Sequence, residues 1–465
     1  MEPPVRARTL VLAGLIGLSP AFALAAAPAA DEHPVLDEIA GAVSPEAMRA
    51  TIQALVGFGT RHTLSDTVSN TRGIGAARRW AQARFGEISQ GCGGCLQIVT
   101  PSQTFTGARI PKPAEVMDVV AIQRGTTDPD RVIVITGHID SRVSDPMNAT
   151  SDAPGADDDG SGTATVLETA RILSKYRFAA TLVYSVDSGE EQGLFGAKVI
   201  AGYARAQGWR VEADLNNDIV GDTTGQNGVV DNTHIRVFSE GTKAVETPKQ
   251  ADARRYNGGE VDSPSRNLAR YIDDLASRYL THFSATMVYR TDRYGRGGDQ
   301  TAFLEQGYPA VRFTEAVENY TREHQDVRED KGVRYGDRIE AVDFPYLAQV
   351  ARLNAITMAS LAWAPPPPEG FSIEGAVGSD TALKWQAAPG AAAYRVYWRD
   401  TTAPRWSHSR LVPEGTATTL KDVIIDDWNF GVASVSADGF VSPVEFPGPA
   451  GSFVSPAPET AAGKP

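Results

Sequence analysis

The chain has 465 residues, of which 42% are hydrophobic and 22% are charged, and its formal net charge at pH 7 is −13. This length exceeds that of a typical single domain, so two or three domains are expected. The acidic balance argues against a nucleic-acid groove or an anionic membrane surface as the partner, because both require clustered cations.

The first residues have the pattern of a secretory signal peptide. Arg6 and Arg8 precede an apolar run, and small residues at 23–27 have the spacing of a cleavage site. We therefore predict a signal peptide over residues 1–27 and an exported protein, periplasmic or extracellular; an uncleaved membrane anchor is the alternative. No later segment is long and apolar enough for a spanning helix, so the mature chain is expected to have no membrane span.

Helical periodicity covers residues 36–90, and the two cysteines of the chain follow it in the segment GCGGC. In an exported chain, thiols this close favour a short disulfide between Cys92 and Cys95. A redox-active pair and a metal site are the alternatives, but the neighbouring glycines disfavour the helix start that a redox C-x-x-C motif normally has.

From about residue 115, strand patterns alternate with helix patterns. Strands are expected at 115–125, 130–138, 179–189, 211–222 and 308–316, and helices at 162–176, 191–208, 267–280 and 342–362. This alternation predicts an α/β fold with a mostly parallel, helix-covered sheet, and in such sheets sites form at the carboxyl ends of the strands. Residues 222–266 show little periodicity and are expected to form excursions from the sheet.

The composition changes after the last of these helices. The segment APPPPEG at 364–370 cannot continue a helix and predicts a stiff linker. Residues 371–455 then alternate apolar and polar positions, which predicts a small all-β sandwich that resembles a fibronectin type III module. We expect the main domain to span residues 31–363 and the C-terminal module to serve as a spacer or to bind a polymer or protein partner.

Candidate metal ligands stand at or near the ends of the predicted strands. The candidates are His138, the run Asp157–Asp159, the pair Glu190 and Glu191, Asp218, and His324. Imidazole and carboxylate ligands together suit zinc, and manganese or cobalt would also fit. Asp140, two residues after His138, could orient the imidazole ring by accepting a hydrogen bond from the ring nitrogen that does not bind the metal.

Two acidic clusters each allow more than one role. The run Asp157–Asp159 could be a helix cap or a calcium loop, but the spacing of a calcium loop is missing. In the adjacent pair Glu190 and Glu191, one carboxylate could bind metal while the other accepts a proton from a metal-activated water.

These motifs, in their order along the chain, resemble those of the co-catalytic di-zinc exopeptidase family, which includes secreted bacterial leucyl-type aminopeptidases, glutamate carboxypeptidases and, more distantly, glutaminyl cyclases. The segments that carry the resemblance are GHID, PGADDDGSG, DSGEEQGLFG, NNDIVG and the late histidine, within residues 110–360. The resemblance implies two zinc ions, one held by His138 and Asp218 and the other by Glu191 and His324. It also implies that Asp158 bridges both ions beside a cis peptide to Asp159, with Glu190 as the general base and Asp140 behind His138.

The chain departs from the family at one motif. Many relatives have a histidine in a GGDH segment, where this chain has Gln300 after Asp299. Nearby, Arg290, Arg293 and Arg296 are either a solvated basic loop or a cationic rim that contacts a substrate carboxylate or carbonyl oxygen.

The resulting hypothesis is an exported zinc aminopeptidase that acts on peptide substrates. The alternatives are carboxypeptidase, dipeptidase or glutaminyl cyclase chemistry on the same scaffold, or a metal-stabilised binding protein without catalysis. The adjacent glutamates favour a hydrolase over a cyclase, because cyclases typically have an aspartate at the second acidic position.

Overall fold

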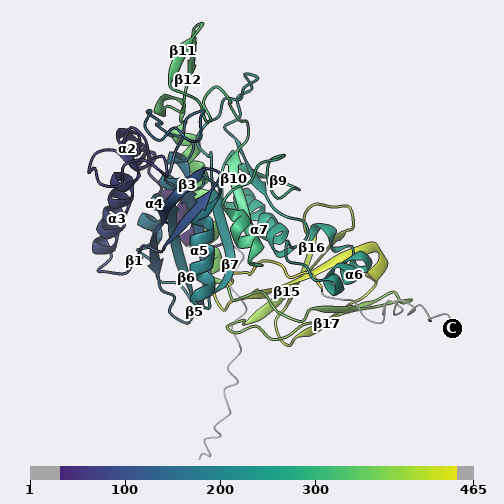
Figure 1. Cartoon of the computed structure of the whole chain (residues 1–465). Coiled ribbons are helices and arrows are strands. Elements are labelled where there is room, and N and C mark those ends of the chain that lie inside the picture. The colour runs from purple at the N-terminus through teal and green to yellow at the C-terminus, as the bar shows by residue number, and fades with distance from the viewer. Residues whose placement is uncertain (1–31, 448–465) are drawn as a thin grey trace, which may run out of the picture.

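The computed structural model describes residues 32–447 (Figure 1). The predicted signal peptide at 1–27 therefore lies outside the described residues. Within the described part, no helix has the length and apolar character needed to cross a bilayer.

An eight-stranded sheet forms the centre of the molecule, in the order β1-β4-β6-β5-β7-β10-β8-β9. Its strands are β1 (Gln97–Val99), β4 (Val119–Gln123), β5 (Asp128–His138), β6 (Ala180–Asp187), β7 (Arg210–Asn217), β8 (His234–Phe238), β9 (Ser284–Val288) and β10 (Ala310–Glu315). β5 pairs in parallel with both β6 and β7, and β7 pairs in parallel with β10. β4 is antiparallel to β6 and to β1, and β10 is antiparallel to β8. At the far edge β8 pairs in parallel with β9, so four of the seven pairings are parallel and three are antiparallel. The prediction of a mostly parallel sheet holds by this narrow majority, and the sheet as a whole is mixed.

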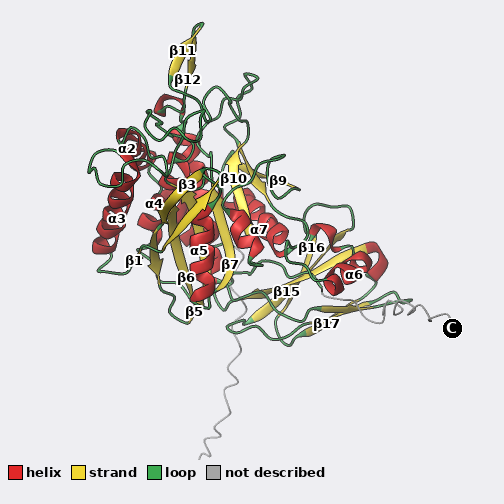
Figure 2. Cartoon of the chain, viewed as in Figure 1, coloured by secondary structure: helices red, strands yellow, loops and turns green. Residues whose placement is uncertain are grey.

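Helices cover both faces of this sheet (Figure 2). One face packs against α1 (Pro34–Gly41), α2 (Pro45–Gly57), α3 (Gly73–Gly91), α4 (Gly160–Leu173), α7 (Pro264–Tyr279) and α9 (Phe344–Trp363), and the other against α5 (Phe195–Ala206) and α8 (Gln300–Glu305). The alternation of β5 produces this division: Ile133 and Ile135 enter the first core, and Val132 and Val134 enter the second.

The segment 222–266 is more regular than its sequence suggests. It contains β8, which pairs with β10 inside the main sheet, and α6 (Pro248–Asn257). The excursion interpretation was therefore wrong for β8. A five-residue strand with His234 and Arg236 among its residues has too weak an apolar pattern to be recognised alone.

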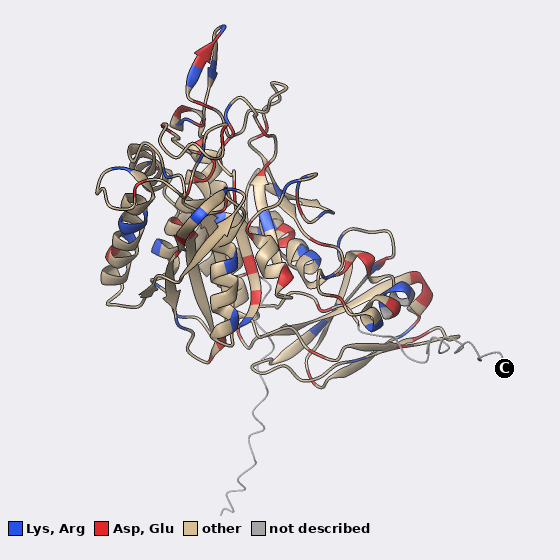
Figure 3. Ribbon diagram, viewed as in Figure 1, with Lys and Arg blue, Asp and Glu red and all other residues tan. Residues whose placement is uncertain are grey.

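Two β-hairpins lie outside the main sheet. One is formed by β2 (Ser102–Gly107) and β3 (Ile110–Met117), and the other by β11 (Arg328–Asp330) and β12 (Val333–Tyr335). The second hairpin projects from the top of the molecule in Figure 3 and carries both acidic and basic residues.

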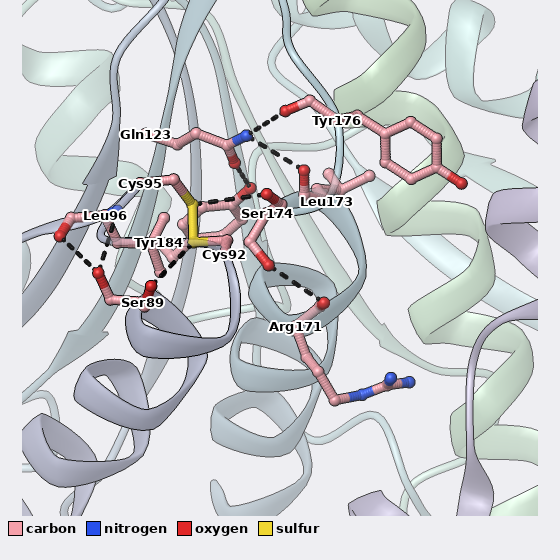
Figure 4. Close-up of a disulfide and its surroundings, with 10 residues drawn as sticks. All are labelled: Ser89, Cys92, Cys95, Leu96, Gln123, Arg171, Leu173, Ser174, Tyr176 and Tyr184. Atoms are coloured by element: carbon pink, nitrogen blue, oxygen red, sulfur yellow. Dashed lines mark hydrogen bonds between the residues drawn. A yellow bond between two sulfur atoms is a disulfide. The ribbon is translucent and has the colours of Figure 1, made fainter.

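The predicted disulfide between Cys92 and Cys95 is present (Figure 4). It closes the turn between α3 and β1, and the Ser89 hydroxyl, which lies beside it in the last turn of α3, donates to Leu96 O at 3.0 Å. This bridge therefore fixes the glycine-rich turn to the helix before it, which is a structural role.

The C-terminal region forms two three-stranded antiparallel sheets. One has the order β13-β14-β17 (Ser372–Glu374, Thr381–Lys384 and Ala417–Leu420), and the other has the order β16-β15-β18 (His408–Val412, Ala393–Asp400 and Trp428–Val435). Trp385, Tyr394 and Phe430 belong to the apolar core of this region. The all-β character is as predicted, whereas the resemblance to a fibronectin type III module stays a prediction.

The C-terminal region packs closely against the main domain. Asp262, two residues before α7, pairs with Arg270 of that helix and with Arg399 of β15, each at 2.7 Å. Phe440 joins the core of the main domain, where its ring lies on Trp363 and stacks on His33. The proline segment does not hold the two parts apart, because Pro365 and Pro368 are buried and Arg131 donates to Ala364 O at 2.7 Å.

Candidate metal centre

The predicted ligands converge at the carboxyl edge of the central strands. His138 is the last residue of β5, Asp218 directly follows β7, and Glu191 lies in the turn after β6. These three strands are adjacent and parallel, so their carboxyl ends meet at the same edge. Asp158 reaches the same point from the loop before α4, and His324 from the loop after β10.

One group of possible ligands consists of His138, Asp158 and Asp218. His138 Nε2 lies 3.3 Å from Asp158 Oδ1 and 3.8 Å from Asp218 Oδ1. Burial lowers the pKa of His138, but the charge of Asp159 and the close carboxylates of Asp140 and Asp158 outweigh this effect, so the pKa is well above its usual value in the metal-free protein.

A second group consists of Asp158, Glu191 and His324. His324 Nε2 lies 2.9 Å from Asp158 Oδ2 and 3.1 Å from Glu191 Oε2. The two oxygens of Asp158 thus face different histidines, which is the arrangement that a carboxylate between two cations needs. The backbone of His324 has a φ of 53°, a left-handed conformation that is uncommon for a residue other than glycine and is often found at functional sites.

Glu190 lies at the edge of both groups. Its Oε2 is 4.0 Å from His138 Nε2, and its side chain is 13% exposed. Burial is the main cause that raises the pKa of Glu190 to about 8, and the charges of Asp218 and Glu191 add to the effect of burial. A carboxyl with this pKa can exchange protons near neutral pH.

Asp140 lies behind His138, as the resemblance implied, but the contact differs in detail. His138 Nδ1 is 3.1 Å from the backbone oxygen of Asp140 and 3.6 Å from its carboxylate. The carboxylate also accepts hydrogen bonds from the backbone N–H groups of Glu190 and Glu191, both at 3.3 Å, and from Thr63 at 2.7 Å. Asp140 therefore fixes the glutamate turn as well as the imidazole.

Hydrogen bonds of Asp159 stabilise the Asp157–Asp159 loop. The Asp159 carboxylate accepts from Gly162 N and so caps α4, and it also accepts from His138 N at 2.8 Å. The bond between Asp158 and Asp159 is cis, as the resemblance implied. The helix-cap interpretation of the triplet is thus correct for Asp159, while Asp158 faces the histidines.

Two residues that the sequence did not indicate hold this loop from behind. The fully buried Arg61 donates to Ile139 O at 2.6 Å and to Gly155 O at 2.8 Å. Asp337 accepts from Asp157 N at 2.9 Å and from Asp158 N at 2.7 Å. Both lie far from the loop in sequence, so no local pattern marks them.

A third group of carboxylates, formed by Asp157, Asp222 and Glu315, lies close enough together to suggest an ion. However, Gly221 N donates to Asp157 at 2.7 Å, and Asp222 N donates to Glu315 at 3.0 Å. Asp222 itself pairs with Arg322. Burial is the main cause that raises the pKa of Asp157 to about 7. Because backbone N–H groups and Arg322 already contact these carboxylates, we assign no ion to this group.

The three arginines of the predicted cationic rim differ in exposure and in ion pairing. Arg290 is exposed, whereas Arg293 is buried between Glu318 and Glu323, at 3.6 Å and 3.4 Å. Arg296 pairs with the same two glutamates, at 2.9 Å and 2.5 Å. Two of the three cations are therefore already paired, which weakens the interpretation of the loop as a cationic rim.

The departure at Gln300 also has a structural explanation. Gln300 Nε2 donates to Asp292 Oδ2 at 2.7 Å, so the side chain turns towards this loop carboxylate. The neighbouring Asp299 is completely buried, and within the described residues neither of its carboxylate oxygens has a hydrogen-bond partner.

The donor set fits divalent cations. Five side chains with nitrogen or oxygen donors form two groups that share Asp158. His138 Nε2 and Glu191 Oε1 are buried and form no hydrogen bond with any residue from 32 to 447. Buried polar atoms are normally paired, so these two need a partner, and mixed imidazole and carboxylate ligands suit zinc.

Known relatives match almost the whole described chain. The family model "Peptidase family M28" matches residues 118–333. A "Probable zinc metalloprotease" of Leptosphaeria maculans is 44% identical over 411 residues, which cover 88% of this chain and 95% of that protein. Another protein of the same name from Pyricularia oryzae is 43% identical over 419 residues, which cover 88% of this chain and 83% of that protein.

Solved structures show a similar fold. The LapA aminopeptidase of Legionella pneumophila superposes with a TM-score of 0.51 at 17% identity, covering 75% of this chain and 77% of that one. LapB of the same organism gives a TM-score of 0.52, also at 17% identity, covering 72% of this chain and 77% of that one. At these identities the likeness concerns the fold alone. From the extent and identity of the sequence matches, the chain belongs to peptidase family M28.

Proposed function

We propose that the protein is an exported zinc aminopeptidase that removes N-terminal residues from peptides at a centre of two zinc ions. His138, Asp158 and Asp218 would hold one ion, and Asp158, Glu191 and His324 the other. The observation that carries the proposal is the division of Asp158 between two histidines, with one oxygen 3.3 Å from His138 and the other 2.9 Å from His324. Family membership and the names of the relatives, zinc metalloproteases, support the same chemistry.

Bound zinc would polarise the scissile carbonyl and lower the pKa of an attacking water. Glu190 is the one carboxylate of the glutamate pair outside both ligand groups, so it is available to accept a proton from that water. It then donates the proton to the leaving amine. The Asp140 carboxylate accepts a hydrogen bond from the backbone N–H of Glu190, which keeps Glu190 in place, and it also orients His138.

The test is hydrolysis of aminoacyl amides with and without a strong chelator. We expect activity to disappear on chelation and to return with added zinc. Peptide hydrolysis that persists without metal would overturn the proposal. Analysis of the products from a peptide ladder then shows whether residues leave from the amino end.

Arg142 favours a second candidate, a dipeptidase or carboxypeptidase that recognises a substrate carboxylate. Its Nε lies 3.7 Å from Glu191 Oε2, and its side chain is 12% exposed. This nitrogen has no hydrogen bond in the described part of the chain. Guanidinium groups pair well with carboxylates, so Arg142 could hold an anion at the edge of the centre.

The geometry of a short peptide fits this position. In a dipeptide the terminal carboxylate carbon lies roughly 4 Å from the scissile carbonyl carbon. A dipeptide with its scissile carbonyl at the metals could therefore reach Arg142 with its terminal carboxylate. Turnover of dipeptides with free and amidated C-termini separates the candidates. An aminopeptidase cleaves both, whereas a dipeptidase prefers the free acid, and Arg142→Gln removes that preference.

A further inference from the structure

Arg312 is a buried cation in the middle of the sheet. It lies on β10, where its backbone is in register with Asn216 of β7 and Phe238 of β8, and its side chain is 0% exposed. Its neighbours Val311 and Phe313 enter the first apolar core, so the arginine points to the opposite face. A charge at such a position must be paired, because an isolated one is very costly to bury.

The guanidinium joins a metal-centre carboxylate to a loop. Nη2 lies 2.8 Å from Asp218 Oδ2, and Nη1 lies 3.2 Å from Asp292 Oδ2 and donates to Gly297 O at 2.8 Å. Asp292 in turn accepts from Gln300, the residue that replaces the family histidine.

The loop that contains Gly297 and Gly298 lies close to the guanidinium of Arg312. A Cβ atom at Gly298 would lie 2.7 Å from Arg312 Nη1 and 2.6 Å from Gln300 Oε1, which is closer than real Cβ contacts. A larger residue at 298 would force the ends of these two side chains to shift, so the glycine lets both approach the loop backbone.

The pairing divides the two oxygens of Asp218. Oδ2 is taken by Arg312, and Oδ1 is the oxygen on the side of His138, 3.8 Å from Nε2. Asp158 differs, because each of its oxygens faces a histidine.

We propose that Arg312, anchored by Asp292, is a positioning residue that leaves only Oδ1 of Asp218 open to a metal ion. The inference rests on the proposed metal centre. Without the guanidinium, Asp218 could rotate or offer both oxygens, and the ion on the His138 side would be held less well. Residues that orient a metal ligand in this way typically change metal affinity by about 10–100-fold when removed.

The experiment compares Arg312→Met and Arg312→Lys with the wild type in the full chain. Zinc content is measured during competition with a chromogenic chelator, and the visible spectrum is recorded after cobalt replaces zinc. We expect Arg312→Met to weaken one of the two sites by about 10–100-fold, to leave the other unchanged and to alter the cobalt spectrum. Arg312→Lys keeps the charge but lacks the planar fork, so it should restore the affinity only in part.

Arg131→Met is a matched control, because Arg131 is also a buried arginine of the sheet but contacts Glu212 and Ala364 O. It should lower stability without changing either zinc affinity. If Arg312→Met does not fold, Asp292→Asn takes its place, since it removes the charged anchor of the guanidinium and should weaken the same site by a smaller factor. Wild-type affinities and an unchanged cobalt spectrum in the folded variant would overturn the inference. If the wild type itself did not bind zinc or did not hydrolyse peptides, the proposed function would be overturned instead.

Discussion

Two regions of this molecule bury several charged side chains, and they balance those charges differently. At the contact between α7 and the C-terminal sheets, Asp262 pairs with Arg270 and Arg399, and Asp273 pairs with Arg405. At the carboxyl edge of the main sheet, carboxylates outnumber the protein cations around them, and buried oxygens such as Glu191 Oε1 have no hydrogen-bond donor among residues 32–447.

The difference separates a structural charge cluster from a functional one. At the interface each of these carboxylates has an arginine partner. The buried atoms without a hydrogen bond in that part of the described chain are nitrogens such as Arg399 Nε, whereas at the carboxyl edge they include carboxylate oxygens of Glu191 and Asp299, which a divalent cation can pair with. Buried aspartates and arginines occur in both regions, so the presence of these charged residues alone does not distinguish them. The kind of unpaired atom distinguishes them, because a carboxylate oxygen without a donor can pair with a cation and a guanidinium nitrogen cannot.

The largest effect is expected at Glu190. Glu190→Gln keeps the shape of the side chain but cannot accept the proton, so kcat should fall by about 10²–10⁴-fold. Zinc content and thermal stability should remain near those of the wild type, because Glu190 belongs to neither ligand group. Undiminished turnover would show that another group accepts the proton.

The corresponding change at the interface should act on stability alone. Asp262→Asn leaves Arg270 and Arg399 buried without their counter-charge, and breaking a buried pair in this way typically costs about 3–5 kcal/mol. Denaturant unfolding measures the loss, and kcat with zinc content serves as the control. A loss of zinc in this variant would mean that the two clusters are coupled.

The metal-free protein should become less stable as pH rises from about 5 to 8. Burial raises the pKa of Asp187 to about 7 and that of Glu190 to about 8, so the folded state binds more protons than the unfolded state in this range. The stability contributed by these protonated carboxyls is complete below their unfolded pKa and is lost as pH rises through the folded values.

Thermal melts across this pH range, with and without zinc, check the sign. Zinc should flatten the decline, because metal binding competes with protons for the same site. A metal-free protein whose melting temperature rises between pH 5 and 8 would contradict the account of the carboxyl edge.

The smallest effect is expected at the rim of the interface. Arg405 pairs with Asp273, but its side chain is 63% exposed. Solvent screens such pairs, so Arg405→Met should cost less than about 1 kcal/mol. A loss as large as that of Asp262→Asn would show that exposure does not decide which ion pairs hold the C-terminal region.

The sequence predicted the ligands better than it predicted their supports. His138, Glu191 and Asp218 were recognisable because each stands at or just after the end of a buried strand, where parallel neighbours bring their side chains together. Arg61 and Asp337 contact the same loop from distant parts of the chain, and nothing in their local sequence indicates this.

Arg312 did leave a signal, since it interrupts the apolar strand YPAVRF beside a predicted site. Strand order was harder to predict. The segment of β4 precedes β5 in the chain, yet β6 lies between them in the sheet. The buried contact of the C-terminal sheets was equally hidden, since a proline segment indicates a break in the chain but not what packs across it.

The most direct test of the account is a crystal structure of the zinc-loaded protein with anomalous data at the zinc edge. The account predicts one peak among His138, Asp158 and Asp218 and another among Asp158, Glu191 and His324, with Glu190 coordinated to neither. No peak at these groups, or an ion bound directly by Glu190, would contradict it.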